Sequence, residues 1–301
     1  MTDKKSLNSF SDELTGAVET ASAYTLLVDA RRRYPASGIA YTADLILTAD
    51  HVITRDENIR VGLPDGKYLP ATIAGRDPGS DLALLRLSEK ALKPAQTADA
   101  PARIGQLVLA LGRPSDAGMQ ASFGIVYAIG GPARTVRGGL LDQYLQTETT
   151  SYPGFSGGPL VDTQGRLLGL NTSGRTPGSA LTIPTSVAWA IADSLAKHGA
   201  VKRGYLGIRT QAVALNEATQ KMLKREQANG LLIMWLESDG PAEKDGLLVG
   251  DILVSVNAHP VSDPDELFAA LSGDVVGKQV DVAILRGGQL QSQKVTVGER
   301  K

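Results

Sequence analysis

The chain of 301 residues contains no cysteine, and this absence removes several kinds of chemistry at once. Without thiols there are no disulfides, no thiolate metal sites and no cysteine nucleophile. Only three histidines are present, so candidates for an imidazole base are few. No apolar run approaches the roughly 18 residues that a membrane-spanning helix needs. Lys plus Arg (31) nearly balance Asp plus Glu (32), so we expect no nucleic-acid partner.

The beginning of the chain lacks the features of a secretory signal. Met1–Lys5 carries charge, but no apolar stretch follows it. We therefore expect a cytoplasmic protein, with an extracytoplasmic location as the alternative if a longer precursor is trimmed. Residues 1–11 are polar, and we expect them to form a flexible N-terminus.

The length favours two domains, and the texture of the sequence changes where one would end. From residue 38 to residue 183, short β-type runs alternate with Gly and Pro, which favours an antiparallel barrel or sandwich. Thr185 or Ser186 is then expected to cap a helix that Gly199 ends. Residues 200–204 are predicted to be a linker. Residues 205–301 alternate strand-like and helix-like segments, which predicts a compact α+β module.

A glycine-rich loop, Pro153–Leu160, displays one hydroxyl, that of Ser156. Glycine permits unusual backbone angles and the close approach of another chain. The amides of Gly154 and Ser156 can converge on one point, as an oxyanion hole requires. The alternative is an ordinary turn, since Ser and Gly are common in turns. A base and a carboxylate elsewhere in the chain would favour the first interpretation.

Candidates for both groups are present. His51 follows an apolar strand, whereas His198 sits at a helix end that favours a cation, and His259 is expected in a turn. Asp81 directly precedes an apolar run, and a buried carboxylate needs a partner such as an imidazole N–H. The alternative for Asp81 is a strand cap. Arg31–Arg33 is expected to be a solvated surface loop.

The three residues occur in the order His, Asp, Ser, which is the order in chymotrypsin-like proteases. Their surroundings, Thr-Ala-Asp-His-Val, Ser-Asp-Leu-Ala-Leu-Leu and Gly-Phe-Ser-Gly-Gly-Pro-Leu, resemble the HtrA/Deg family. Residues 205–208 and 240–251 are similar to a PDZ domain of the HtrA type. The resemblance implies a mainly β fold, a chymotrypsin-like double β-barrel followed by an α+β PDZ domain. It implies a trypsin-like protease domain at 12–199, a linker at 200–204 and a PDZ domain at 205–301.

The resemblance also implies roles for individual residues. Ser156 would be the nucleophile, His51 the base and Asp81 the residue that orients His51. Gly154 and Ser156 would form the oxyanion hole. Substrate-binding residues would be Asn171, Thr172 and Ser173. No metal and no cofactor are expected. Peptide-binding residues of the PDZ domain would be Tyr205, Leu206, Gly207, Ile208, Leu267, Phe268 and Leu271, although the apolar spacing of the last three also fits a plain core.

Two functions remain open on the sequence. The first is an ATP-independent serine endopeptidase in protein quality control, which cleaves unfolded or misfolded proteins and is regulated by its PDZ domain. The second is an inactive holdase or scaffold that binds peptides. Expected partners are peptides with apolar C-termini and, by resemblance, further copies of the chain in a trimer. Phe155 stands where the family has Asn or Asp, so we expect packing to hold the serine loop.

Overall fold

A computed structural model describes residues 3–134, 140–176, 179–201, 204–271 and 275–299. The chain divides into two compact units, Met1–Val201 and Lys202–Lys301. The division falls within the predicted linker 200–204, of which residues 202–203 lie outside the described ranges. Each unit has its own apolar core.

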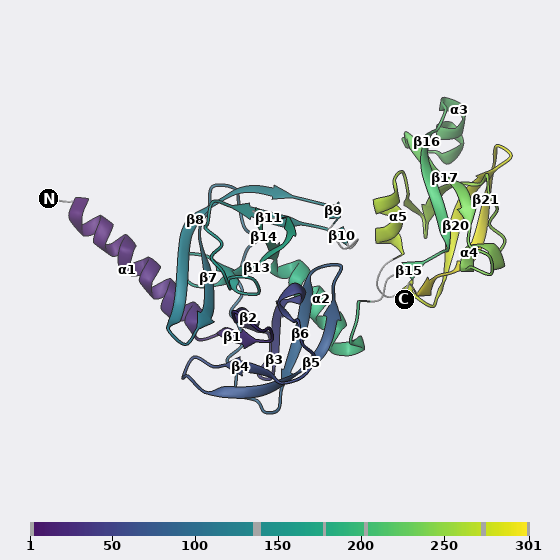
Figure 1. The fold of residues 1–301 in the computed structure, drawn as a ribbon. Helices are drawn as coiled ribbons and strands as arrows, with labels where there is room; N and C mark the ends of the chain where they lie inside the picture. Colours follow the sequence, from purple (N-terminus) through teal and green to yellow (C-terminus); the bar gives the residue numbers. More distant parts are fainter. Residues whose placement is uncertain (1–2, 135–139, 177–178, 202–203, 272–274, 300–301) are drawn as a thin grey trace. The chain divides into compact units, whose positions relative to one another are not determined.

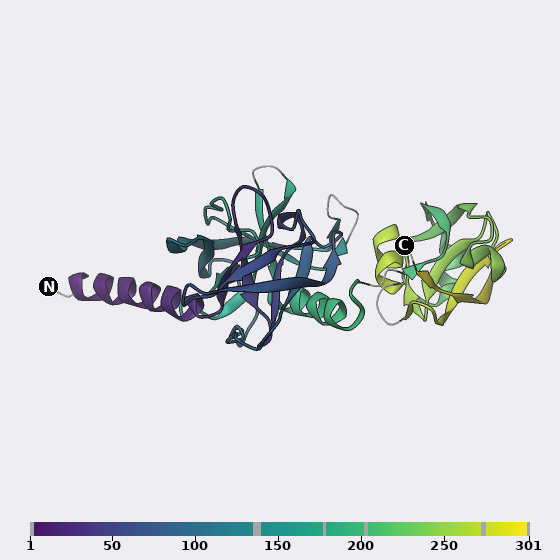
Figure 2. The ribbon, with the colours of Figure 1, turned by 60° about the horizontal axis from the view of Figure 1, so that its bottom comes forward.

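The N-terminal segment differs from the expected flexible stretch at residues 1–11. A single helix, α1, covers Asp3–Ser22. The helical spacing of apolar residues begins upstream of Leu14, with Leu7 and Phe10, and no proline interrupts it. Phe10 packs edge-on against Phe123, while Ala17 and Ala21 are buried in the core. Figures 1 and 2 show the first turns of α1 extending away from the barrels.

The first barrel is closed, with strands in the order β1-β2-β3-β6-β5-β4. Its core consists largely of Leu, Ile, Val and Ala side chains. The antiparallel pairing of β3 with β6 places Ala49 opposite Leu82, so the residues that follow β3 lie beside those that precede β6. The strands are β1 Thr25–Asp29, β2 Ala36–Ala40, β3 Leu45–Ala49, β4 Ile59–Gly62, β5 Tyr68–Asp77 and β6 Leu82–Leu87.

The second barrel is also closed, in the order β11-β14-β13-β12-β7-β8. A short pair, β9 Ala133–Arg134 and β10 Leu140–Leu141, follows β8. The barrel strands are β7 Leu107–Ser115, β8 Gly118–Gly130, β11 Tyr144–Thr147, β12 Pro159–Val161, β13 Leu167–Thr176 and β14 Ser179–Pro184. This pair of barrels confirms the predicted chymotrypsin-like architecture.

Helix α2, Thr185–His198, ends the first unit. Gly199 closes it with a φ of 73°, as predicted, because glycine adopts left-handed backbone angles without strain. The predicted side-chain cap at Thr185 or Ser186 is wrong, since Pro184 occupies the cap position and no side chain caps the helix. The end of α2 packs against β5, where the Arg76 amide donates to Gly199 O at 3.1 Å.

The second unit contains a sheet in the order β16-β17-β18-β20-β21, with β19 paired to β18. Among the strands that the structure describes, β16 pairs with β17 alone, so its other side is an open edge there. The strands are β15 Gly204–Tyr205, β16 Ile208–Ala214, β17 Asn229–Leu236, β18 Ile252–Val256, β19 His259–Pro260, β20 Gln279–Arg286, β21 Gln289–Thr296 and β22 Gly298–Glu299. The helices are α3 Glu217–Leu223, α4 Pro241–Lys244 and α5 Pro264–Ala270.

Candidate active site

His51 and Asp81 meet where β3 ends and β6 begins. His51 lies in a single 3₁₀ turn, Asp50–Val52, directly after β3. Asp81 occupies the residue before β6 with a φ of 60°, and its carbonyl accepts a bond from the Asp50 amide at 3.0 Å. The His51 Nδ1 atom lies 2.8 Å from Asp81 Oδ2 and 3.0 Å from Oδ1. The two barrel strands therefore fix the imidazole against the carboxylate.

The Asp81 carboxylate accepts more than the imidazole hydrogen bond. The backbone amide of His51 donates to Asp81 Oδ1 at 2.9 Å, and the Thr172 hydroxyl donates to Oδ2. Burial acts to raise the pKa of Asp81, but the donors from His51 and Thr172 outweigh it and lower that pKa below its usual range. An ionised Asp81 holds the Nδ1 proton of His51. The Nε2 atom is then the one available to accept a proton.

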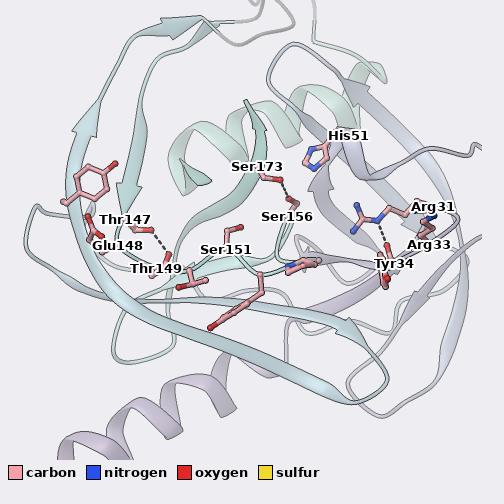
Figure 3. A pocket seen from close by; sticks show the side chains of 15 residues that line it. Arg31, Arg33, Tyr34, His51, Thr147, Glu148, Thr149, Ser151, Ser156 and Ser173 are labelled. Atoms are coloured by element: carbon pink, nitrogen blue, oxygen red, sulfur yellow. Dashed lines mark hydrogen bonds between the residues drawn. The ribbon is translucent and has the colours of Figure 1, made fainter. Parts of the chain in front are cut away.

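Ser156 and His51 line one cavity of about 810 Å³ (Figure 3). Ser156 Oγ lies 2.9 Å from Ser173 Oγ in a hydrogen bond, and within the described ranges no hydrogen bond joins it to His51. Hydrogen bonds in unliganded active sites often tighten only when substrate arrives. In this structure the Ser156 hydroxyl is directed at Ser173, and His51 lies on the wall of the same cavity.

The backbone before Ser156 forms a type II turn. The Phe155 amide donates to Tyr152 O at 3.0 Å, and Gly154 at the third position has a φ of 91°. Proline at the second position excludes the turns that need a positive φ there, so the positive φ of Gly154 defines the type. A side chain on Gly154 would also collide with Pro114, because a Cβ would lie 2.4 Å from Pro114 Cβ.

Phe155 points away from the cavity into an apolar cluster. It is fully buried, among Val108, Ala110, Val126, Leu145, Leu160 and Leu168. Tyr152 packs edge-on against its ring, with 5.4 Å between the centroids. Gly112 faces the other side, where a Cβ would come within 2.7 Å of Phe155 Cδ1. Phe155 therefore holds the loop through shape, since a phenyl ring offers no strong hydrogen-bond acceptor.

The three predicted substrate-binding residues lie in different environments. Ser173 lines the cavity. Asn171 is buried, and its side chain donates to Pro159 O and accepts from the Thr182 hydroxyl. Thr172 is buried against Asp81. The structure thus brings only Ser173 of this set to the cavity wall, and it gives Thr172 a position in the carboxylate network that the sequence analysis missed.

Charged residues that were not predicted also line the cavity. Arg31 and Arg33 lie on one side of Ser156 and Glu148 on the other (Figure 3). Arg33 is exposed, in keeping with the expected surface loop, but Arg31 is half-buried. The Arg31 side chain donates to the carbonyls of Tyr34 and Pro35, and burial lowers its pKa. No pattern in the sequence linked this loop to Ser156.

The predicted peptide groove of the second unit involves both loop and core residues. Gly207 has a φ of 74°, and its carbonyl accepts from the Glu237 amide at 2.8 Å. Leu206, Leu267 and Leu271 are buried in the core, while Phe268 and Ile208 are half-buried. The Tyr205 hydroxyl donates to Glu237. The open edge of β16 begins directly after this loop, at Ile208.

Within the described part of the chain, none of the helices combines the length and the apolar character that a membrane span requires. No group of three or more His, Asp or Glu side chains is placed to hold a metal ion within those same ranges.

Comparisons with known proteins agree with this geometry. The sequence matches the trypsin-like peptidase domain over residues 36–170 and the PDZ domain over residues 204–297. It is 33% identical to a probable periplasmic serine endoprotease, DegP-like, from Rhizobium meliloti (strain 1021), over 89% of this chain and 54% of that protein. A similarly named protein from Halomonas elongata is 34% identical, over 89% of this chain and 57% of that protein. The chain therefore spans about half the length of these curated relatives.

The names of the curated relatives correct one prediction. We expected a cytoplasmic protein because no apolar stretch follows Met1–Lys5. That prediction is wrong, because the relatives are named periplasmic endoproteases, which points to an extracytoplasmic location. The inference failed because it used the absence of one feature near the first residue, and such an absence does not specify a compartment.

Solved structures extend the likeness to both units. The HtrA-type protease AlgW with a decapeptide has a TM-score of 0.78 and is 27% identical, over 96% of this chain and 99% of that one. The serine endoprotease from Yersinia pestis has a TM-score of 0.77 and is 30% identical, over 96% of this chain and 98% of that one. This chain belongs to the HtrA-type serine protease family, with a trypsin-like peptidase domain followed by one PDZ domain.

Proposed function

We propose that this chain is a serine endopeptidase whose catalytic residues are Ser156, His51 and Asp81. The observation that carries the proposal is the convergence of the three side chains from separate segments. His51 and Ser156 line one cavity, and Asp81 binds the His51 ring from behind at 2.8 Å. The alternative, an inactive holdase, depended on Phe155 alone and is not favoured, because the relatives are named endoproteases.

The mechanism follows from the position of each group. Ser156 Oγ attacks the scissile carbonyl while His51 Nε2 takes its proton, and the same proton later passes to the leaving amine. Asp81 remains ionised, holds the ring in the required tautomer and stabilises the imidazolium. Water attacks the acyl-enzyme in the same way and releases the second product. All proton transfers use one imidazole.

Backbone N–H groups stabilise the negative charge that develops on the carbonyl oxygen of the substrate. Gly154 N–H and Ser156 N–H donate to no protein acceptor in the described chain, so both are available to the oxyanion. The loss of one such donor typically costs about 10²–10³ in rate. The positive φ of Gly154 supports this assignment, since the reversed central peptide of a type I turn would require a negative φ there.

The experiment that tests the assignment uses covalent labelling. We expect a fluorophosphonate probe to label Ser156 and no other serine. Ser156→Ala should abolish cleavage of a denatured protein while leaving thermal unfolding nearly unchanged, because this residue lies at the cavity and not in the core. Labelling that persists in Ser156→Ala, or cleavage that survives it, would remove Ser156 from the mechanism.

We also propose that the substrates are unfolded or misfolded proteins and that the PDZ domain regulates their cleavage. An extended segment can enter the cavity and present its backbone to Ser156, whereas a folded surface does not offer such a segment. A homo-oligomer, a trimer by resemblance, stays a prediction for analytical ultracentrifugation. ATP and other cofactors have no role in the proposed chemistry.

For the PDZ domain we propose recognition of an apolar C-terminus. The amides of Leu206, Gly207 and Ile208 would hold the terminal carboxylate, and the open edge of β16 would pair with the peptide backbone. Peptides with a free apolar C-terminus should bind far better than their amidated forms in a calorimetric titration. Bound peptide should also change the rate of cleavage, and removal of residues 204–301 should abolish that change. Equal binding of both peptide forms would contradict the carboxylate site.

A further inference from the structure

Most of the peptide groups around Ser156 form hydrogen bonds within the described chain. Tyr152 O accepts from the Phe155 amide at 3.0 Å, and Phe155 O accepts from the Gly158 amide at 2.8 Å. The Gly157 amide donates to Asn171 O at 2.8 Å. Buried backbone groups are nearly always satisfied in this way. Between Pro153 and Gly158, the amides that donate to no protein group among the described residues are those of Gly154 and Ser156, the proposed oxyanion donors.

Ser37, which lies outside this loop, binds two carbonyls next to those donors. Along the chain, the carbonyl of Gly154 lies between the two donors, and the carbonyl of Ser156 follows the second. The Ser37 hydroxyl donates to Gly154 O at 2.7 Å, and the Ser37 amide donates to Ser156 O at 3.2 Å. Ser37 lies in β2 of the first barrel and is fully buried. A barrel strand is therefore hydrogen-bonded to the loop at two points, one before and one after the amide of Ser156.

The direction of the Ser37 hydroxyl is also fixed. The backbone amide of Arg113 donates to Ser37 Oγ at 2.8 Å. A hydroxyl has one hydrogen, so the Arg113 amide occupies an acceptor position and leaves the hydrogen for Gly154 O. Because the group is shielded from water, no solvent molecule replaces the bond when the loop moves. The hydrogen bonds therefore run in one direction, from the Arg113 amide to the Ser37 hydroxyl and from that hydroxyl to Gly154 O.

The two hydrogen bonds from Ser37 matter more with Phe155 in the loop than they would with a polar residue that could itself bind the loop backbone. A phenyl ring cannot accept a hydrogen bond from the loop backbone, so packing and Ser37 act together with the backbone bonds of the loop. The two restraints adjoin each other across Gly112, where a Cβ would lie 2.7 Å from Phe155 Cδ1 and 3.0 Å from Ser37 Oγ. No larger residue fits between them. Packing holds the Phe155 side chain, whereas Ser37 holds the carbonyls of Gly154 and Ser156.

We propose that Ser37 is a positioning residue for the oxyanion hole, which acts by holding Gly154 O and Ser156 O so that the two flanking amides face the substrate. Ser37 touches neither substrate nor His51, and it acts only through the loop. This inference rests on the proposed endopeptidase function. Ser37 thus keeps the two donors aligned by hydrogen bonds that the Phe155 side chain cannot make.

The test compares Ser37→Ala with the unmodified full-length chain on one peptide substrate. We expect kcat to fall about 10- to 100-fold, less than the 10²–10³ typical of a lost donor, because both amides remain but are misaligned for part of the time. KM should stay within about twofold, since only transition-state interactions are affected. A peptide boronate, whose tetrahedral adduct places an oxygen in the hole, should lose affinity in parallel with kcat. The matching product peptide, which forms no tetrahedral adduct, should bind the wild type and Ser37→Ala equally.

Two variants separate positioning from general loosening of the fold. Tyr24→Phe removes another buried hydroxyl that donates to a backbone carbonyl, Gly165 O at 2.5 Å, and it should leave kcat unchanged. Ser37→Cys keeps a hydrogen-bond donor, although a weaker and somewhat larger one, and its kcat should lie between those of the wild type and Ser37→Ala. If Ser37→Ala does not fold, the cysteine variant makes the same comparison.

The results distinguish this inference from the function on which it rests. An inactive wild type would refute the endopeptidase. An active wild type with unchanged kcat in Ser37→Ala, or in Ser37→Cys if only that variant folds, would refute the positioning role alone. Equal losses of boronate and product affinity would also refute it, because a structural defect weakens both ligands, whereas a misaligned oxyanion hole weakens only the boronate.

Discussion

The proposed active site has a base end, at His51 and Asp81, and a nucleophile end, at Ser156, and different forces hold the two. At the base end, Asp81 accepts hydrogen bonds from the His51 ring, the His51 amide and the Thr172 hydroxyl. At the nucleophile end, Ser156 Oγ pairs with Ser173, and its neighbour Phe155 is held by apolar packing. Charge and directional hydrogen bonds hold the base end, whereas apolar packing and hydrogen bonds to the loop backbone hold the nucleophile end.

This difference indicates which half of the site can vary in sequence. Ion-supported hydrogen bonds depend on particular atoms at particular distances, so the base end tolerates few residue types. Packing depends on volume, and several side chains can provide it. The HtrA-like sequence retains His51 and Asp81 in their usual frames, and it departs from the family at Phe155. Phe155 lies at the nucleophile end, where apolar packing holds the loop.

The largest expected effect tests the base end. Asp81→Asn should lower kcat by about 10⁴, because an amide that donates to Nδ1 favours the tautomer with its proton on Nε2, and that atom then cannot accept from Ser156. Steady-state kinetics with a peptide substrate measures the loss. Asp162→Asn is the matched control, because Asp162 is buried and accepts three bonds from Gln164 and Arg166 away from the cavity. Equal losses in both variants would contradict a specific role for Asp81.

Much of the base end could be predicted from the sequence. An apolar run after Asp81 and a single histidine after an apolar strand made these two residues candidates, because a buried carboxylate needs a partner, and the resemblance to the HtrA family supplied their roles. Thr172 was placed among substrate-binding residues instead, since nothing in a sequence shows which way a strand residue faces until its register is known. The same limit hid Ser37, whose importance appears only when β2 meets the loop.

The next effect tests the nucleophile end through packing. Phe155→Ala should lower the free energy of unfolding by about 3–5 kcal/mol, because it leaves a cavity in a closed apolar cluster. It should also lower kcat, since the loop loses the restraint beside Ser156. Denaturant unfolding and kinetics measure the two changes. Leu85→Ala, a fully buried site in β6, should cost about 2–5 kcal/mol without a comparable loss of kcat. Full activity in Phe155→Ala would show that packing does not restrain the loop.

Phe155→Asn makes the comparison from the other direction. It restores the family's residue, yet it places a polar group among Val108, Leu145 and other apolar side chains. We expect it to lower stability and to change kcat through the fraction of time in which the oxyanion hole is formed. Identical rates and peptide affinities in Phe155→Asn and the wild type would show that the loop is insensitive to this position.

A smaller effect appears in the acid dependence of stability. Hydrogen bonds lower the pKa of Asp81 in the folded protein below the ordinary value of 3.8. A lowered native pKa contributes stability that is present above the ordinary value and is lost as pH falls through the lowered one. The stability difference between the wild type and Asp81→Asn should therefore be constant near neutral pH and should shrink below pH 3.8. A difference independent of pH down to the acid transition would contradict this.

The smallest effect concerns neither end but the exposed cavity wall between them and solvent. Arg31 and Arg33 line the side of the cavity opposite Glu148, and within the described ranges neither forms an ion pair with a carboxylate. Exposed ion pairs contribute only about 0.2–1 kcal/mol, which corresponds to a change of at most about fivefold. Arg33→Glu should therefore lower kcat/KM two- to fivefold, roughly, for peptides with Asp or Glu near the scissile bond and raise it for matched lysine peptides. Arg32→Glu changes the net charge equally but lies outside the cavity lining, and it should change neither value. If both variants shift the two peptides alike, the long-range field of the loop and not the cavity wall selects the substrate.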